Sequence, residues 1–170
     1  MLKIIAAVTI NRVIGQENGL PFRLADDMKR FKEKTVGHPV VCGSTTYLSL
    51  PAKFRPLPDR ENIVLTRDPS KLKGERVTVV SDFAEIINRS HKEDLWIIGG
   101  ATIYTLALPV TKELHLTRVQ AIIPGDSLFP KWDSADWSLT SQEMVSADEK
   151  NQYSFSWEVW RCRNTGPASK

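Results

Sequence analysis

The sequence has few residues that could build a metal centre. It contains two cysteines, Cys42 and Cys162, and three histidines, and none of these five residues has the spacing of a zinc-binding or redox motif. We therefore expect no metal, and we interpret both thiols as buried or incidental. So few cysteines are typical of a protein from a reducing cytoplasm, which is the compartment that we expect.

Long hydrophobic runs and clusters of one charge are also missing. No apolar stretch reaches the roughly 20 residues of a membrane span, and the first residues lack the basic head and cleavage site of a secretory signal. The 23 Lys and Arg residues are interspersed with 20 Asp and Glu residues, for a net charge of +3. Proteins that bind nucleic acid more often carry a clustered basic stripe. We expect small anionic ligands as partners, with neither nucleic acid nor a membrane.

The apolar residues that are present predict a single α/β domain. Of the 170 residues, 41% are hydrophobic, enough for one full core. Apolar, β-branched runs predict strands at 2–8, 39–42, 62–65, 76–80, 95–98 and 113–119. Helical patterns at 24–35, 44–50, 82–88 and 101–106 lie between several of them. This alternation predicts a mostly parallel sheet with crossover connections, flanked by about four helices.

The end of the chain has a different pattern. Segments 137–141 and 153–163 alternate apolar and polar residues and are joined by a polar stretch, which predicts an antiparallel hairpin at the sheet edge. With this hairpin the predicted sheet has eight strands. Residues 164–170 are polar and contain glycine and proline, so we expect a domain over 1–163 followed by a flexible tail.

An acidic residue lies on the apolar face of the predicted helix 24–35. Leu24, Met28, Phe31 and, less strictly, Val36 form a stripe at three- and four-residue spacing, and Asp27 falls within it. We therefore predict that the Asp27 side chain faces inward. The preceding acid, Asp26, falls on the opposite, polar face, where we expect an exposed ion pair with Arg30.

Two interpretations of the inward acid are open. A carboxylate near a helix N-terminus can simply complement the positive end of the helix dipole. The irregular loop 9–23 that precedes the helix contains Gly15, Gly19 and Pro21 and follows a predicted buried strand. Such a loop beside an inward carboxylate favours a ligand pocket with a mobile lid.

Two predicted strands are followed by glycine and then by a helix. The first turn is Gly43-Ser44-Thr45-Thr46, and the second is Gly99-Gly100-Ala101-Thr102-Ile103-Tyr104. Exposed amides at a helix start suit an anion, although either glycine turn alone can reflect close packing of strand and helix. Together they indicate a dinucleotide, and neither is the GxGxxG fingerprint.

A third element favours NADPH over NADH. Strand 62–65 ends in Thr66-Arg67, a hydroxyl followed by a cation, which suits a ribose 2′-phosphate. The alternative for Arg67 is a solvated surface charge.

Many short elements occur along the chain in a characteristic order. They are Ile5-Ala6-Ala7, Val13-Ile14-Gly15, Asn18, Leu20-Pro21, Leu24 with Asp27, Phe31-Lys32, Pro39-Val40, Gly43, Thr46, Leu57-Pro58, Arg60-Glu61-Asn62, Ile98-Gly99-Gly100, Tyr104, Thr117 and Gly125-Asp126. In order and spacing this set resembles the dihydrofolate reductase family, from residue 2 to about residue 161. The resemblance implies an enzyme that reduces 7,8-dihydrofolate to tetrahydrofolate for one-carbon metabolism. Hydride passes from NADPH to pterin C6, and N5 takes a proton.

The resemblance also implies roles for individual residues at the substrate. Asp27 accepts hydrogen bonds from the pterin N3–H and 2-amino group, and Thr117 supports it. Leu20 and Phe22 belong to the catalytic loop. Arg60 binds the glutamate tail, with Lys32 nearby, and the rings lie against Ile5, Met28, Phe31, Leu50 and Leu57. Packing alone also explains the apolar residues, and Arg60 has an alternative as a surface ion pair within Asp59-Arg60-Glu61.

The same resemblance places the cofactor. Ala7 and Ile14 hold the nicotinamide carboxamide through backbone groups, and the loop Gly15 to Leu20 closes over it. Tyr104 flanks the nicotinamide. The remaining cofactor residues are Asn18, Gly19, Gly43, Ser44, Thr45, Thr46, Leu65, Thr66, Arg67, Ile98, Gly99, Gly100, Ala101, Thr102 and Ile103.

The sequence departs from the family pattern at several positions. The usual loop tryptophan is Phe22, so an indole N–H that can hold an ordered water is missing. Ser44 and Thr102 stand where the family often has basic residues, and Thr45 where it often has histidine. Binding of NADPH would then depend on Arg67 and backbone amides.

Two other functions stay open at this point. One is a related reductase of another heterocycle, of the kind found in riboflavin synthesis. The other is a non-catalytic nucleotide-binding protein that kept the fold, which the departures at Phe22 and Ser44 make conceivable. Asp27 and Arg60 together favour dihydrofolate, because a ribose-phosphate substrate needs neither a carboxylate for a guanidine-like edge nor an arginine for a glutamate tail. We expect a monomer.

Overall fold

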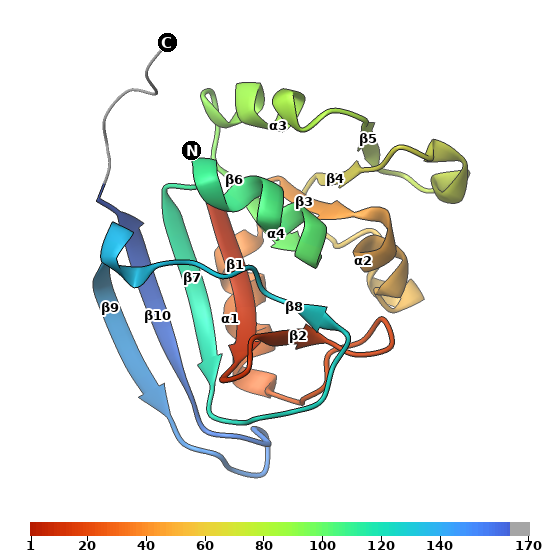
Figure 1. Ribbon diagram of the computed structural model, residues 1–170. Helices are drawn as coiled ribbons and strands as arrows, with labels where there is room; N and C mark the ends of the chain where they lie inside the picture. Colours follow the sequence, from red (N-terminus) through yellow and green to blue (C-terminus); the bar gives the residue numbers. More distant parts are fainter. Residues whose placement is uncertain (164–170) are drawn as a thin grey trace.

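The computed structural model describes residues 1–163, which form an eight-stranded sheet in the order β5-β4-β3-β6-β1-β7-β10-β9 (Figure 1). From β5 to β7 each neighbouring pair is parallel, and β10 runs antiparallel to both β7 and β9. The strands are β1 (Leu2–Thr9), β3 (Val40–Gly43), β4 (Asn62–Leu65), β5 (Thr78–Val80), β6 (Leu95–Gly99), β7 (Glu113–Val119), β9 (Trp137–Val145) and β10 (Phe155–Cys162). The predicted fold class is confirmed.

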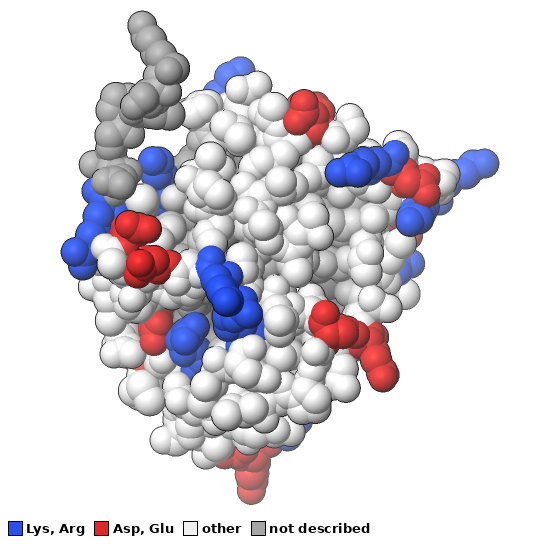
Figure 2. Space-filling model, in the orientation of Figure 1, with Lys and Arg blue, Asp and Glu red and all other residues white. Residues whose placement is uncertain are grey.

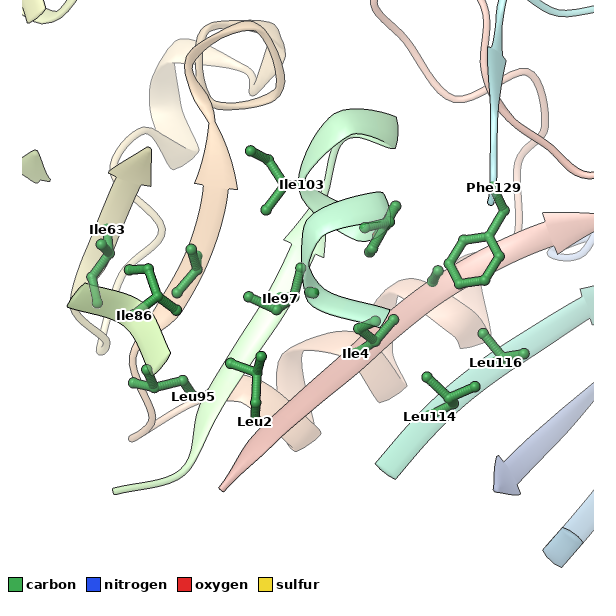
Figure 3. Packing of buried hydrophobic residues seen from close by; sticks show 14 of the residues in the cluster. Leu2, Ile4, Ile63, Ile86, Leu95, Ile97, Ile103, Leu114, Leu116 and Phe129 are labelled. Carbon is green, nitrogen blue, oxygen red and sulfur yellow. The ribbon is translucent and has the colours of Figure 1, made fainter. Parts of the chain in front are cut away.

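Four α-helices in the described chain cover the two faces of this sheet: α1 (Ala25–Thr35), α2 (Ser44–Ser49), α3 (Phe83–Ser90) and α4 (Ala101–Ala107). In the view of Figure 1, α4 lies in front of the sheet and α1 behind it. The main core lies on the α3 and α4 side, where Ile86 lies near Ile63 and Leu95, and Ile4 lies beneath α4 (Figure 3). On the other face Ile5 packs with Phe31 of α1. Each central strand is thus buried on both sides, as its continuous apolar run predicts.

The predicted elements are present, with differences at their ends and in two short strands. The edge strand β9 continues to Val145, four residues beyond the predicted end, because its pairing with β10 holds an exposed polar stretch that carries no alternation signal. The strands β2 (Val13–Gly15) and β8 (Ser127–Leu128) pair with each other and are too short for a pattern to predict. The predicted flexible tail, 164–170, lies outside the described residues.

The packed stripe of α1 differs from the predicted one. Leu24 and Thr35 are buried and Phe31 is half-buried, whereas Met28 and Val36 are 52% and 37% exposed. The stripe therefore follows positions 24, 27, 31 and 35 and still includes Asp27. The helix end is closed by a hydrogen bond of 2.7 Å from the Thr35 hydroxyl to the Phe31 carbonyl.

The predicted ion pair between Asp26 and Arg30 is wrong. Asp26 Oδ2 accepts a 2.8 Å hydrogen bond from Asn151 Nδ2, and the Asp26 N–H donates to Asn151 Oδ1 at 3.2 Å. Because Leu24 at the N-cap offers no capping side chain, the buried Asn151 and the Lys150 carbonyl satisfy the first N–H groups of α1. The loop before β10 therefore fixes the end of α1 that carries Asp27.

Candidate active site

Three elements meet at Asp27. Its Oδ1 accepts a 2.5 Å hydrogen bond from the Thr117 hydroxyl on β7 and a 3.0 Å hydrogen bond from the Trp157 indole on β10. Thr117 and Trp157 are directly paired across the two strands, so their side chains emerge side by side beneath α1. The expected contact with Thr117 is thus present in the structure, whereas sequence reasoning missed Trp157.

Burial controls the charge of Asp27. Burial away from water raises the pKa of Asp27 above its ordinary value. The hydrogen bonds from Thr117 and Trp157 and the charge of Arg30 lower the pKa, but they do not cancel the rise. The carboxyl group consequently titrates closer to neutral pH than an exposed aspartate does.

Apolar side chains cluster on the side of the sheet that α1 covers. Ile5, Phe31 and Leu57 pack in one cluster with Ile98, and Ile98 also contacts the neighbouring cluster that contains Leu50. Beside Asp27 in the chain, Met28 is more than half exposed, as is Leu20 of the preceding loop. Partly exposed apolar side chains on the same helix face as a half-buried carboxylate suit a flat ring with one polar edge.

Arg60 is held in place by a carbonyl and a hydroxyl oxygen. Its Nε donates to the Pro58 carbonyl at 2.8 Å and its Nη1 to the Thr35 hydroxyl at 2.5 Å. The adjacent Glu61 instead takes two hydrogen bonds from Arg89, at 3.0 and 2.8 Å. Within residues 1–163 Arg60 forms no close ion pair. The charge of Asp59 acts on its guanidinium and partly offsets the lowering of its pKa by burial. Lys32, on the last turn of α1, is exposed.

A second site is a cavity of about 760 Å³ at the carboxyl ends of β3, β4 and β6. Its size suits a dinucleotide. Both glycine turns and the end of β4 contribute, through Gly43, Ser44, Thr45, Thr46, Leu65, Thr66, Arg67, Gly100, Ala101, Thr102 and Ile103. The other expected cofactor residues do not line this cavity: Ala7, Ile14, Gly15, Asn18, Gly19, Leu20, Ile98, Gly99 and Tyr104.

The two glycine turns touch each other. A Cβ atom at Gly100 would lie 2.8 Å from Thr46 Oγ1, too close for any side chain, and Gly99 has a φ of +140°. The Gly99–Gly100 peptide bond is cis. On α4 the buried Tyr104 donates a 2.9 Å hydrogen bond to the Ile5 carbonyl, which connects the cavity side of the sheet to the strand beside Asp27. Glycine at these two positions therefore lets the backbone of the second turn lie against the Thr46 side chain.

The loop 9–23 is docked on the segment before β8. The Asp126 N–H donates to the Gly15 carbonyl at 3.2 Å, and Asp126 Oδ2 accepts from the Glu17 N–H at 2.9 Å. A Cβ atom at Gly125 would lie 2.3 Å from a Val13 methyl carbon, so only glycine permits this approach. Side-chain and backbone contacts thus hold the loop against this segment.

Position 22 carries no indole, but an indole from another element lies at the site. Phe22 is buried in a cluster with Leu24 and Phe155, and the half-buried Trp157 packs against the same cluster. An indole N–H therefore reaches Asp27 from the sheet rather than from the loop. The alternation of segment 153–163 already put position 157 on one face, but the pairing of β10 with β7, which brings it to Asp27, was not readable from the sequence.

Sequence reasoning also missed part of the cavity lining. Lys71 lines the cavity and compensates in part for the absent basic residues at Ser44 and Thr102. Asp68 also lines it, 3.9 Å from Lys71. Lys71 lies in a short 3-10 helix (Pro69–Leu72) whose position no periodicity predicts.

Known proteins resemble this chain over nearly its whole length. A family model described as dihydrofolate reductase matches residues 1–162. Dihydrofolate reductase of Bacillus subtilis is 37% identical over 170 residues, covering 99% of this chain and 98% of the relative. Dihydrofolate reductase of Haemophilus influenzae is 35% identical over 158 residues, covering 88% of this chain and 91% of the relative.

A solved structure agrees with these sequence relatives. Dihydrofolate reductase from Enterococcus faecalis, complexed with NADP(H) and RAB-propyl, superimposes with a TM-score of 0.88 at 33% identity, covering 96% of this chain and 97% of the other. The buried carboxylate, the dinucleotide-sized cavity and these matches lead to one conclusion: the chain belongs to the dihydrofolate reductase family.

Proposed function

We propose that this protein reduces 7,8-dihydrofolate to 5,6,7,8-tetrahydrofolate with NADPH. The observation that carries the proposal is the inward carboxylate of Asp27, fixed through one oxygen by Thr117 and Trp157. Its other oxygen, Oδ2, accepts no hydrogen bond from residues 1–163, which leaves it for a ligand. The family to which the chain belongs and the NADP(H) in the solved relative support the choice of substrate and cofactor.

Asp27 acts on the pterin by charge and position. Its carboxylate accepts the pterin N3–H and 2-amino hydrogen bonds and so favours the electron-poor, protonated ring. Ile5, Phe31 and Leu57 hold the ring planes, and Arg60, already oriented by Thr35, takes the carboxylate of the glutamate tail. Water supplies the proton for N5. NADPH, when bound, supplies the hydride for pterin C6.

The cavity residues hold the cofactor. Thr46 and the start of α4 offer hydroxyl and backbone N–H groups for the pyrophosphate. Thr66, Arg67 and Lys71 lie where a 2′-phosphate needs donors and positive charge. These side chains fit NADPH better than NADH, and the Asp68 carboxylate beside them limits the preference.

We further propose a cytoplasmic monomer in which residues 1–163 are the catalytic domain. On the face seen in Figure 2 basic and acidic side chains are interspersed, as is typical of a freely diffusing protein.

Burial raises the pKa of the Cys42 thiol to about 12, which keeps it inert. None of the helices in the described residues is long and apolar enough to cross a membrane.

Absorbance of NADPH tests the proposed reaction. The protein should consume NADPH when dihydrofolate is present and leave it unchanged when dihydrofolate is omitted. The same assay with NADH should be slower. Binding of both ligands without turnover would point to a non-catalytic protein, and turnover of another reduced heterocycle in place of dihydrofolate would point to a related reductase.

A further inference from the structure

Trp157 is placed between the substrate carboxylate and a cation. On one side its indole N–H donates to Asp27 Oδ1 at 3.0 Å. On the other, the Arg30 guanidinium lies over its ring, 5.1 Å from the centroid. A cation over the face of an indole draws electron density from the ring and strengthens its N–H as a donor.

The geometry at Asp27 limits how the carboxylate can turn. Thr117 and Trp157 approach the same oxygen from two neighbouring strands, which are paired along their whole length inside the sheet. Two donors on Oδ1 fix the carboxylate plane and leave Oδ2 without a partner among the described residues. If the indole donor is removed, only the Thr117 hydroxyl holds the group, and a hydroxyl can rotate.

We propose that Trp157 is a positioning residue, whose indole N–H sets the orientation and charge of Asp27 for the pterin. This inference rests on the proposed function. In it, Trp157 acts on the bound substrate through Asp27 and not by direct contact. Arg30 supports it from the face of the ring. A purely structural tryptophan would need the ring but not the N–H.

The test separates the N–H from the ring. Trp157→Phe keeps an aromatic ring and removes the donor, and Trp160→Phe is the matched control. Trp160 lies on the same strand, is also half-buried, and donates its indole N–H at 2.8 Å to Glu158 instead of Asp27. Both variants are compared with wild type in the full chain.

Three quantities are measured: the titration of the Asp27 carboxyl carbon by ¹³C NMR, the dissociation constants of dihydrofolate and NADPH, and the single-turnover hydride rate against pH. The charge of Arg30, from the same helix, acts on Asp27, and Glu143 of β9 acts on Arg30. Asp27 in turn raises the pKa of the Tyr104 hydroxyl on α4. β7 and β10 contribute the neutral donors Thr117 and Trp157. All of these groups remain in Trp157→Phe except the indole donor.

In Trp157→Phe the Asp27 midpoint should rise by about one pH unit, which is the size of one lost charge-assisted hydrogen bond. At pH values below the Asp27 midpoint dihydrofolate should bind up to about tenfold more weakly, with NADPH affinity within about twofold of wild type. Trp160→Phe should leave the Asp27 midpoint unchanged. An Asp27 midpoint in Trp157→Phe equal to wild type would overturn the proposal, whether or not turnover falls.

A measurement on the unaltered protein covers the case in which Trp157→Phe does not fold. The indole ¹⁵N–¹H resonance of Trp157 should move with the same midpoint as the Asp27 carboxyl carbon, because the two groups share a hydrogen bond. A Trp157 resonance that is insensitive at that midpoint would contradict the proposal. Absence of NADPH-dependent dihydrofolate reduction by wild type would instead reject the proposed function, so the two failures are distinguishable.

Discussion

The surroundings of Asp27 and the dinucleotide cavity are built in opposite ways. At Asp27, side chains from α1, β7 and β10 are bonded to one another around a single buried charge. The cavity is lined by turns, hydroxyl groups and cations such as Arg67. A buried charge in low dielectric interacts strongly, whereas exposed charges are screened by water. Changes at Asp27 should therefore affect the chemistry, and changes in the cavity should shift affinity by smaller factors.

Replacement of the buried charge should have the largest effect. In Asp27→Asn the pterin loses its anionic partner, and we expect hydride transfer at neutral pH to fall by about a hundredfold or more. NADPH affinity should stay near wild type, because Asp27 does not line the cavity. Stopped-flow single turnovers measure the hydride-transfer rate, and a separate titration measures NADPH affinity. A rate near that of wild type would contradict the claim that the reaction depends more on Asp27 than on the cavity.

The next effect concerns the substrate tail. Arg60→Ala should weaken dihydrofolate binding by about tenfold to a hundredfold, the range for loss of a charge-assisted pair, and should barely change binding of a pterin without the glutamate tail. Arg89→Ala is the control, because Arg89 pairs with Glu61 and Glu93 on the surface. Equal losses for both ligands in Arg60→Ala would exclude the tail contact.

The cavity cations should give smaller shifts. Arg67→Ala and Lys71→Ala should each lower the preference for NADPH over NADH by about threefold to tenfold, since each is a solvated charge near the 2′-phosphate. Lys73→Ala, on the same segment but outside the cavity, should leave the ratio of specificity constants unchanged. A hundredfold loss of the NADPH preference in Arg67→Ala alone would show that the cavity depends on one charge as strongly as the surroundings of Asp27 do.

The last effect is on stability. Burial raises the pKa of Asp27, so the folded state binds its proton more tightly than the unfolded chain does, and ionisation of Asp27 destabilises the fold as pH rises through the unfolded pKa toward the folded one. Asp27→Asn removes this cost. The free energy of unfolding of the variant, relative to wild type, should therefore increase from acid to neutral pH, by about 1.4 kcal/mol for each pH unit between the unfolded and folded pKa values of Asp27. Denaturant titrations at several pH values measure it, and a difference independent of pH would contradict the burial of this charge.

The sequence predicted the central strands and the inward direction of Asp27, because both depend on local pattern: continuous apolar runs and three- and four-residue spacing. The contacts between distant elements were less accessible. Asn151 lies 125 residues from Asp26, and no periodicity connects them. Trp157 reaches Asp27 through strand pairing, and register is a property of the assembled sheet.

The resemblance to the family supplied roles that pattern alone did not. It pointed to Thr117 and to Arg60, and the structure brings the first to Asp27 and bonds the second to Thr35. It also drew attention to the missing indole at Phe22, but it gave no indication that Trp157 donates to Asp27. Departures from a family are thus better judged after the three-dimensional neighbours are known.

The most direct measurement of the central claim is the ¹³C resonance of the Asp27 carboxyl carbon, assigned through Asp27→Asn, during titration with dihydrofolate. We predict that this resonance shifts on binding and that its pH midpoint falls, because the pterin donors favour the ionised form. The resonance of Asp26, which is bonded to Asn151, should not move. Saturation with dihydrofolate that leaves the Asp27 resonance and its midpoint unchanged would show that the pterin does not bind to this carboxylate.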